Sequence, residues 1–114
     1  HPDGKSFFVS SWADGAVYQH QADTGARMGV IRLGSHTTDM LWRDKGEEKA
    51  GEGGEWTGRL FVAAANTNSV FVVAVDSGKN MRLLETINVA LTARHRLGMT
   101  PSGLALSPDR NSLY

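Results

Sequence analysis

Two apolar runs of six residues dominate the hydrophobic pattern of the chain, at residues 60–65 and 70–75. A polar break at residues 66–69 separates them. Runs of this length, rich in Val and Phe and bounded by turn-forming residues, predict two β-strands joined as a hairpin. Neither run alternates between apolar and polar residues, as a strand with one solvated face would. We therefore expect protein to cover both faces of both strands.

The part of the chain before this hairpin has shorter apolar stretches separated by turn residues. Asp14-Gly15 is a strong hairpin signal, and Asp23-Thr24-Gly25 predicts a second turn. A loop is expected at residues 34–37. The expected strands are residues 7–12, 16–20, 28–33 and 38–42.

The same order of strands and turns recurs later in the chain. Three positions of the first unit return at an offset of 53 residues: Phe7 as Leu60, Val17 as Val70, and Asp23 as Asp76. Residues 83–89 and 102–106 complete the second unit. The Pro-Asp pair at positions 2–3 returns at 108–109, which is twice that offset. These concordant offsets indicate an internal repeat.

A four-stranded antiparallel unit that recurs at this spacing is typical of a β-propeller blade. We predict an all-β chain of two four-stranded antiparallel blades, with a repeat of about 53 residues and no helix longer than a turn or two. Residues 1–114 would form one propeller fragment. Two blades leave an apolar sheet face open at each end of the pair. We therefore expect further blades to complete them, from the same parent chain or from other copies.

Residues 43–58 interrupt the repeat with a charged insertion. Residues 43–55 hold eight charged side chains, four Gly and no large apolar residue. Such a segment cannot bury enough apolar surface to offset the entropy lost on ordering it. We expect a flexible surface insertion, and an acidic docking loop or a cation site is the alternative.

The repeat residues resemble a known family. Residues 101–109 read PSGLALSPD and residues 112–114 read SLY, which resembles the P-x-G-x-A-x-S-P-D-G-x-x-x-Y-V register of YVTN-repeat β-propellers. Residues 61–73 resemble the next strand pair of that family. The literal Tyr-Val-Thr-Asn tetrad is replaced by FVSS at 8–11 and FVAA at 61–64. Arg110 stands where the turn Gly is usual, so we expect Asn111 to adopt the left-handed conformation.

The connection over residues 88–101 is similar to one in bacterial proteins that join such a propeller to an alkaline-phosphatase-like phosphoesterase domain. The resemblance implies a binding or interaction scaffold from an extracytoplasmic bacterial protein, periplasmic or secreted. The alternative is the propeller portion of a hydrolase, an alkaline-phosphatase-like phosphoesterase, whose catalytic residues lie outside this chain. We also expect both termini to be cuts within a longer protein, or the result of processing.

Composition narrows the classes of partner. Lys plus Arg and Asp plus Glu both number 12, so the formal net charge is zero, which argues against a nucleic-acid or membrane-surface role. The absence of Cys excludes disulfides, Cys-ligated zinc and a thiol nucleophile. The apolar runs fall far short of the roughly 20 residues that a membrane helix needs, so we expect no membrane insertion.

The histidines and hydroxyl residues do not form a recognisable catalytic or metal-binding pattern. His20, His36 and His95 show no ligand spacing, so the sequence predicts no metal and no cofactor. Ser107-Pro108-Asp109 repeats the Pro-Asp turn of the first unit, which gives it a backbone role and not that of a triad fragment. We therefore predict no catalytic residues.

The loops predict one binding face. In a propeller, the loops that join the fourth strand of one blade to the first strand of the next share a face with the hairpins between second and third strands. By that rule residues 34–37 and 92–100 should lie beside Asp14-Gly15 and residues 66–68, with the charged insertion on the opposite face. Arginine forks suit phosphate and carboxylate groups, which points to a small anionic ligand or a protein partner. Trp12, Trp42 and Trp56 are expected to pack the blades, and Trp12, at a strand end beside a turn, is the one best placed to serve instead as a ligand platform. The predicted ligand-binding residues are His36, Asn66, Asn68, Arg94, His95 and Arg96, and ordinary loop residues are the alternative.

Overall fold

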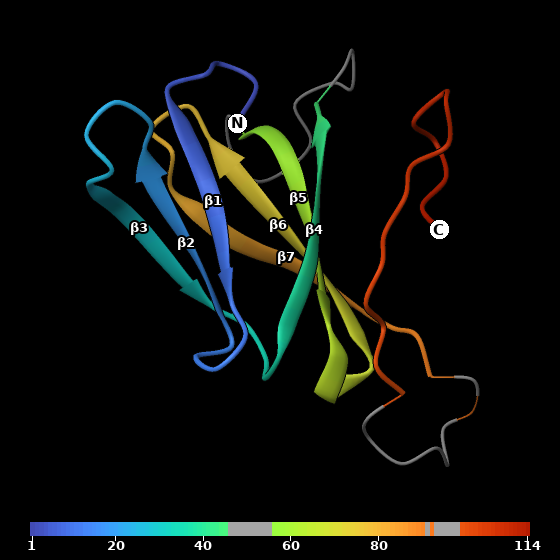
Figure 1. Ribbon diagram of the computed structural model, residues 1–114. Coiled ribbons are helices and arrows are strands. Elements are labelled where there is room, and N and C mark those ends of the chain that lie inside the picture. Colours follow the sequence, from blue (N-terminus) through green and yellow to red (C-terminus); the bar gives the residue numbers. More distant parts are fainter. Residues whose placement is uncertain (46–55, 91, 93–98) are drawn as a thin grey trace.

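The computed structural model describes residues 1–45, 56–90, 92 and 99–114, which form two antiparallel sheets (Figure 1). The first sheet has the order β1-β2-β3, with β1 at Ser6–Ser11, β2 at Ala16–Gln21 and β3 at Arg27–Arg32. The second has the order β4-β5-β6-β7, with β4 at Thr37–Asp44, β5 at Trp56–Ala64, β6 at Ser69–Asp76 and β7 at Met81–Asn88. The prediction of an all-β chain is confirmed.

Helical structure is minimal. The 3-10 helix η1, Ala65–Thr67, is a three-residue turn between β5 and β6. In the described part of the chain, no helix has the length and apolarity to cross a membrane.

The predicted hairpin is the centre of the second sheet. β5 and β6 pair in a register that places Leu60 opposite Val73 and Phe61 opposite Val72. Residues 60–65 and 68–75 are all buried, as their unbroken apolar pattern predicts. Successive side chains point to opposite faces of the sheet, so Leu60 and Phe61 belong to two different core clusters.

The main core lies between the two sheets. Val17 of β2 packs with Leu60, Val62, Phe71 and Val73 of the second sheet. Half-buried apolar side chains surround them: Phe8, Ile31, Leu33, Met40, Trp42 and Met81. Full burial of one such Val or Leu contributes about 1.5–3 kcal/mol, so this cluster is the main reason that the sheets stack.

A second, smaller core lies on the other face of β5 and β6. Phe61, Val70 and Val72 form it. Leu104 and Leu113, from the C-terminal segment of residues 99–114, pack against them. In Figure 1 this segment runs beside β4 without becoming a strand of either sheet. The central strands β5 and β6 of the second sheet are thus covered on both faces.

The predicted pair of four-stranded blades is found only in part. Residues 38–42, which the loop-face prediction treats as the first strand of the second blade, belong to β4, which pairs with β5 and opposes Met40 to Val62 and Trp42 to Leu60. This pairing places Met40 and Trp42 against the main core, where their apolar surface is removed from water. Among the described residues the first sheet therefore has three strands and the second has four.

The C-terminal segment also differs from the prediction. Residues 102–106 form no strand, and a single bridge joins Leu106 to Leu113. Arg110, and not Asn111, adopts the left-handed conformation, with φ 59°. Its guanidinium hydrogen-bonds the Asp44 carboxylate and the Trp42 carbonyl oxygen, both at 3.2 Å. These tertiary contacts hold an Arg in a conformation that its side chain disfavours.

The predicted insertion at residues 43–58 is bounded by strand residues. β4 continues to Asp44 and β5 begins at Trp56, so the ends of the insertion extend the two paired strands. The expected flexible part, residues 46–55, lies outside the described residues.

The strands of the two sheets correspond at the offset of 53 residues. Shifting β1 by 53 positions places it within β5, and shifting β2 places it within β6. The shifted β3 overlaps β7 over all but its first residue. β4 precedes β5 and therefore has no counterpart among the described residues of the first sheet.

Candidate functional site

The turn between β1 and β2 forms part of one end of the molecule. Gly15 has φ 62°, and its backbone N–H donates to the Ser11 carbonyl oxygen at 3.0 Å. The Asp14 carboxylate accepts hydrogen bonds from the Ser11 hydroxyl at 2.8 Å and the Tyr18 hydroxyl at 3.1 Å. These bonds hold the pKa of Asp14 below its ordinary value, because they favour the ionised carboxylate. The turn is therefore tied to both of its strands.

The connection from β3 to β4 crosses directly over this turn. A Cβ atom placed on Gly15 would lie 2.6 Å from the Gly34 carbonyl oxygen, so the two backbones touch. The His36 backbone N–H donates to the Trp12 carbonyl oxygen at 3.2 Å. The His36 carbonyl oxygen accepts a hydrogen bond from the Ala65 N–H at 3.0 Å. His36 thus joins a turn of the first sheet to the β5–β6 loop of the second.

His36 and Trp12 form a stacked aromatic pair at this junction. Their ring centroids are 3.9 Å apart and the planes differ by 8°. Trp12 is 59 % exposed, the most exposed Trp of the described chain. His36 has φ 61°, a sparsely populated conformation for a residue with a side chain. Such backbone strain occurs disproportionately at binding sites.

The two asparagines of the β5–β6 loop have different environments. Asn66 is exposed. Asn68 is buried, has φ 51°, and accepts the Met99 N–H on its side-chain oxygen at 2.7 Å. Its backbone carbonyl oxygen accepts the Val89 N–H at 2.9 Å. Asn68 therefore holds the loop in shape, while Asn66 is accessible to a ligand.

The structure brings part of the predicted site together. His36, Asn66 and Asn68 lie on loops that meet at one end of the sheets, as the loop-face prediction requires. Arg94, His95 and Arg96 lie outside the described residues, so their place in the site stays a prediction. Trp12, which the sequence marked only as an aromatic platform, stacks on the predicted site residue His36. No local pattern indicates that contact, because it depends on two loops crossing.

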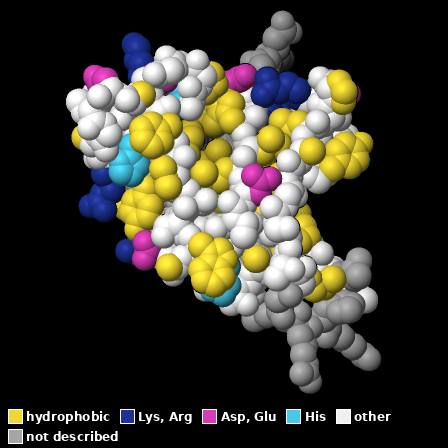
Figure 2. Space-filling model, viewed as in Figure 1, with side chains coloured by type: hydrophobic (Ala, Val, Ile, Leu, Met, Phe, Trp, Pro, Cys, Tyr) yellow, Lys and Arg dark blue, Asp and Glu magenta, His cyan; other side chains and the backbone are white. Residues whose placement is uncertain are grey.

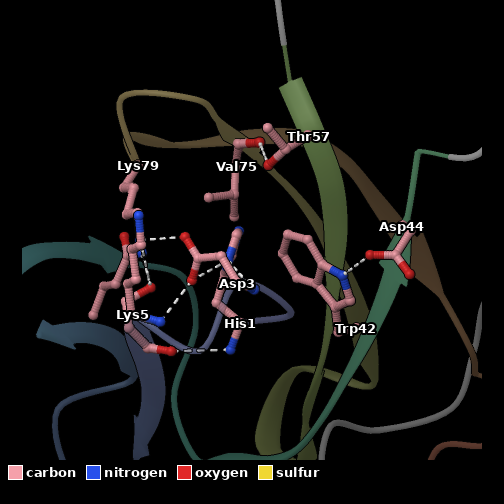
Figure 3. Close-up of polar contacts among 10 residues, drawn as sticks. His1, Asp3, Lys5, Trp42, Asp44, Thr57, Val75 and Lys79 are labelled. Carbon is pink, nitrogen blue, oxygen red and sulfur yellow. Dashed lines mark hydrogen bonds and ion pairs between the residues drawn. The ribbon is translucent and has the colours of Figure 1, made fainter. Parts of the chain in front are cut away.

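The opposite end of the sheets is fixed by polar contacts (Figure 3). The Lys79 ammonium group bonds the Asp3 carboxylate at 2.6 Å and joins the β6–β7 turn to the N-terminal turn. Asp3 also accepts the Lys5 backbone N–H at 2.8 Å. These bonds, with that of Lys79 the largest, hold the pKa of Asp3 below its ordinary value. At the same end of the sheets, within β4, the Trp42 indole N–H donates to the Asp44 carboxylate at 2.7 Å.

The second copy of the Pro-Asp turn has a similar local role. The Ser107 hydroxyl donates to the Asp109 carboxylate, which also accepts the Asn111 backbone N–H at 3.1 Å. These bonds, that of Ser107 first, hold the pKa of Asp109 below its ordinary value. The Ser-Pro-Asp group is thus hydrogen-bonded within its own turn.

Sequence reasoning missed a basic pocket between the second sheet and the C-terminal segment. Arg43, Arg59 and Arg110 line this pocket of about 290 Å³. Arg43 and Arg59 are cross-strand partners, and the Arg43 Nε donates to the Arg110 carbonyl oxygen at 2.8 Å. The Arg59 guanidinium lies over the Trp56 ring, 4.7 Å from its centroid. The sequence alone does not reveal this pocket, because Arg43 and Arg59 face each other only once β4 pairs with β5. Because these contacts hold the C-terminal segment, we assign the pocket a structural role.

The described residues contain no group of three or more His, Asp or Glu side chains that could hold a metal ion. The stacked Trp12–His36 pair and the exposed Asn66 make their end of the sheets the strongest candidate site of the described chain. Comparisons with protein-family models, curated proteins and solved structures found no match to this chain.

Proposed function

We propose that the chain is part of a β-propeller of the YVTN-repeat type and serves as a binding or interaction scaffold. Two features support this proposal. The two sheets stack face to face through an apolar core, and their strands recur at an offset of 53 residues. Radially repeated antiparallel sheets of this kind are the building principle of propellers. In this proposal the two sheets are neighbouring blades.

The observation that carries the binding role is the Trp12–His36 stack. It joins loops of both sheets, one ring is 59 % exposed, and His36 is fixed by backbone hydrogen bonds on both sides. Exposed loops held by a rigid β-scaffold are where binding residues concentrate. Asn66, exposed on the adjoining loop, would orient the ligand.

We propose a small anionic ligand, or an acidic group on a protein partner, as the occupant. Arg94 and Arg96 would hold the negative charge, with His95 beside them. Asn68 would act indirectly, because its side-chain oxygen already accepts the Met99 N–H.

Inorganic phosphate is the simplest probe of this site. Titration followed by the NMR signals of the His36 ring and the Trp12 indole should show saturable shifts. The double substitution Arg94→Ala with Arg96→Ala should weaken binding at least tenfold and leave the unfolding midpoint unchanged. The matched control is Arg27→Ala with Arg32→Ala, two exposed arginines on β3. Equal affinity in the loop variant and the wild type would reject the anion site.

We propose that these residues bind without catalysing, in a periplasmic or secreted protein. The alternative, a propeller portion of a hydrolase with catalytic residues outside this chain, is compatible with the same loop end. A simple assay tests whether the residues of this chain catalyse by themselves. The chain alone should hydrolyse p-nitrophenyl phosphate at the buffer rate, and turnover that disappears in His36→Ala would contradict the scaffold role.

A further inference from the structure

The indole ring of Trp12 has one covered face and one open face. The covered face lies on the His36 imidazole, with ring centroids 3.9 Å apart and planes 8° from parallel. Trp12 is nevertheless 59 % exposed, which a ring stacked on one side reaches only if its other side is open. Figure 2 shows hydrophobic and histidine side chains side by side on the surface at the end where Figure 1 places the turn after β1 and the connection to β4. The open face leaves room for a flat ligand to add to the stack.

This aromatic platform is held in place before any ligand binds. The His36 N–H donates to the Trp12 carbonyl oxygen, and the His36 carbonyl oxygen accepts the Ala65 N–H. Gly15 packs directly on Gly34, with no room for a Cβ atom between their backbones. The loops involved join β1 to β2, β3 to β4 and β5 to β6, so both sheets support the platform. A preorganised site loses little conformational entropy when a ligand binds.

Polar groups accompany the platform. Asp14 follows Trp12 by two residues in the same turn. Its Oδ2 accepts the Ser11 and Tyr18 hydroxyls, whereas its Oδ1 accepts no hydrogen bond from the described residues. The bond from Ser11, and then that from Tyr18, lower the pKa of Asp14, so the group is an ionised carboxylate at neutral pH. Asn66, exposed on the adjoining loop, offers an amide donor and an amide acceptor.

This combination favours a sugar ring over other flat ligands. The C–H groups on one face of a pyranose form an apolar surface that stacks on an aromatic ring, while its hydroxyls project from the rim. An ionised carboxylate only accepts hydrogen bonds, so it suits hydroxyl donors. A nucleobase also stacks on Trp, but its rim carries acceptor nitrogens and oxygens, which the carboxylate of Asp14 repels.

We propose that the open face of Trp12 binds the pyranose ring of a neutral carbohydrate. Trp12 carries the apolar face of the sugar, Asp14 Oδ1 accepts one ring hydroxyl, and the Asn66 amide bonds a second. One sugar ring on one open platform buries little surface, so the dissociation constant should lie in the millimolar range. The inference rests on the proposed binding role of this loop end and does not require the loop arginines of the anion site.

Two neutral probes test the platform: the methyl β-glycosides of glucose and galactose, which are locked as pyranose rings. Saturation-transfer-difference NMR should show magnetisation passing to the C–H protons of one ring face. The Trp12 indole N–H signal should shift and saturate as the glycoside is added. Sorbitol, which has hydroxyls but no ring face, should give neither effect. No saturable change with either glycoside, or an equal response to sorbitol, would overturn the proposal.

Substitutions at the platform locate the binding. Trp12→Ala should weaken glycoside binding at least tenfold, and Trp12→Phe should keep part of it, since a smaller ring still stacks. The matched control is Phe7→Ala, because Phe7 is also exposed and stacks on a histidine, His20, with centroids 5.5 Å apart and planes 16° from parallel. It should bind the glycosides like the wild type. Unchanged affinity in a Trp12→Ala chain with a wild-type unfolding midpoint would remove Trp12 from the site.

The acceptor role of Asp14 has its own matched pair. Asp14→Asn keeps the shape of the side chain, removes its charge and should weaken glycoside binding several-fold. Asp23→Asn, in the β2–β3 turn at the other end of the first sheet, should have no effect. Adenosine that shifts the Trp12 signal where the glycosides do not would assign the platform to a nucleobase and refute the sugar.

A parallel titration separates this inference from the anion site. The double substitution Arg94→Ala with Arg96→Ala should leave glycoside binding unchanged, because the platform does not include those residues. Loss of glycoside binding in that variant, at an unchanged unfolding midpoint, would contradict a neutral sugar held by Trp12 and Asp14. Glycoside binding by a wild-type chain that fails to bind phosphate would support the platform and reject only the anion site.

Discussion

The strands of the two sheets recur at an offset of 53 residues, but the side chains of the first sheet are less buried than those of the second. In β6, seven of the eight residues are buried, from Ser69 to Val75. In its counterpart β2, Tyr18 and His20 are half-buried and Gln21 is exposed. The residues 53 positions after Tyr18 and His20 are Phe71 and Val73, so the first sheet also carries more polar side chains at these two positions than the second sheet does. In a repeat architecture the burial of a unit depends on its neighbours as much as on its own sequence.

The largest expected difference is between the counterparts Leu60 and Phe7. Leu60→Ala should lower the free energy of unfolding by about 2–5 kcal/mol, because it leaves a cavity in the core between the sheets. Phe7→Ala should cost about 1 kcal/mol or less in dilute solution, because Phe7 is 41 % exposed. Urea unfolding followed by Trp fluorescence gives both values. Equal losses would show that the first sheet is covered as well as the second.

A smaller difference should separate the two asparagines of the β5–β6 loop. Asn68→Ala removes the acceptor of the Met99 N–H and places Ala at φ 51°, which together should cost about 2–3 kcal/mol. Asn66→Ala, at an exposed position of the same loop, should stay within about 0.5 kcal/mol of the wild type. If Asn66 instead proved the costly position in urea unfolding, Asn68 would not be the residue that holds this loop.

The smallest effect concerns the ion pair that joins the two units at the end opposite the loop site. Lys79 holds the pKa of Asp3 below its ordinary value of 3.8. A lowered folded-state pKa adds stability above pH 3.8, and that stability is lost as the pH falls through the folded value. Lys79→Met should therefore lower the urea midpoint slightly at pH 7, and by less and less as the pH falls below 3.8.

Lys5→Met is the control for that measurement. Its ammonium group makes only a minor contribution at Asp3, and its backbone N–H, which bonds the carboxylate, is retained. It should change the midpoint less than Lys79→Met does. A Lys79 effect that is as large at pH 2 as at pH 7 would mean that the side chain acts through packing and not through charge.

Much of the fold could be predicted because its signals are local. The unbroken runs around Phe61 and Val72 indicate two strands buried on both faces, and the structure confirms this. The loop-face rule also treats residues 38–42 as the first strand of the second blade, and β4 does pair with β5. The expected fourth strand of the first sheet is what failed, because that sheet has three strands among the described residues. The contacts of Met40 and Trp42 could not be predicted, since they pack in a core that exists only once the sheets have stacked.

In the candidate site, too, the features set by local sequence could be predicted, and those set by distant contacts could not. The loop-face rule placed His36 and Asn66 at one end, because it depends only on the order of strands and turns. The structural role of Asn68 could not be predicted, since the N–H that its side chain accepts belongs to Met99, 31 residues away. Likewise, the left-handed Arg110 depends on Asp44 and Trp42, which are 66 and 68 residues distant.

Amide hydrogen exchange, resolved strand by strand in a dilute monomeric sample, tests the central comparison most directly. Amides of buried strands open only through the least frequent fluctuations, whereas those of half-covered sheets open more often. We expect β6 to exchange at least tenfold more slowly than its counterpart β2, although both are central strands of their sheets. Equal protection of β2 and β6 would contradict the conclusion that the first sheet lacks the cover that the second sheet has.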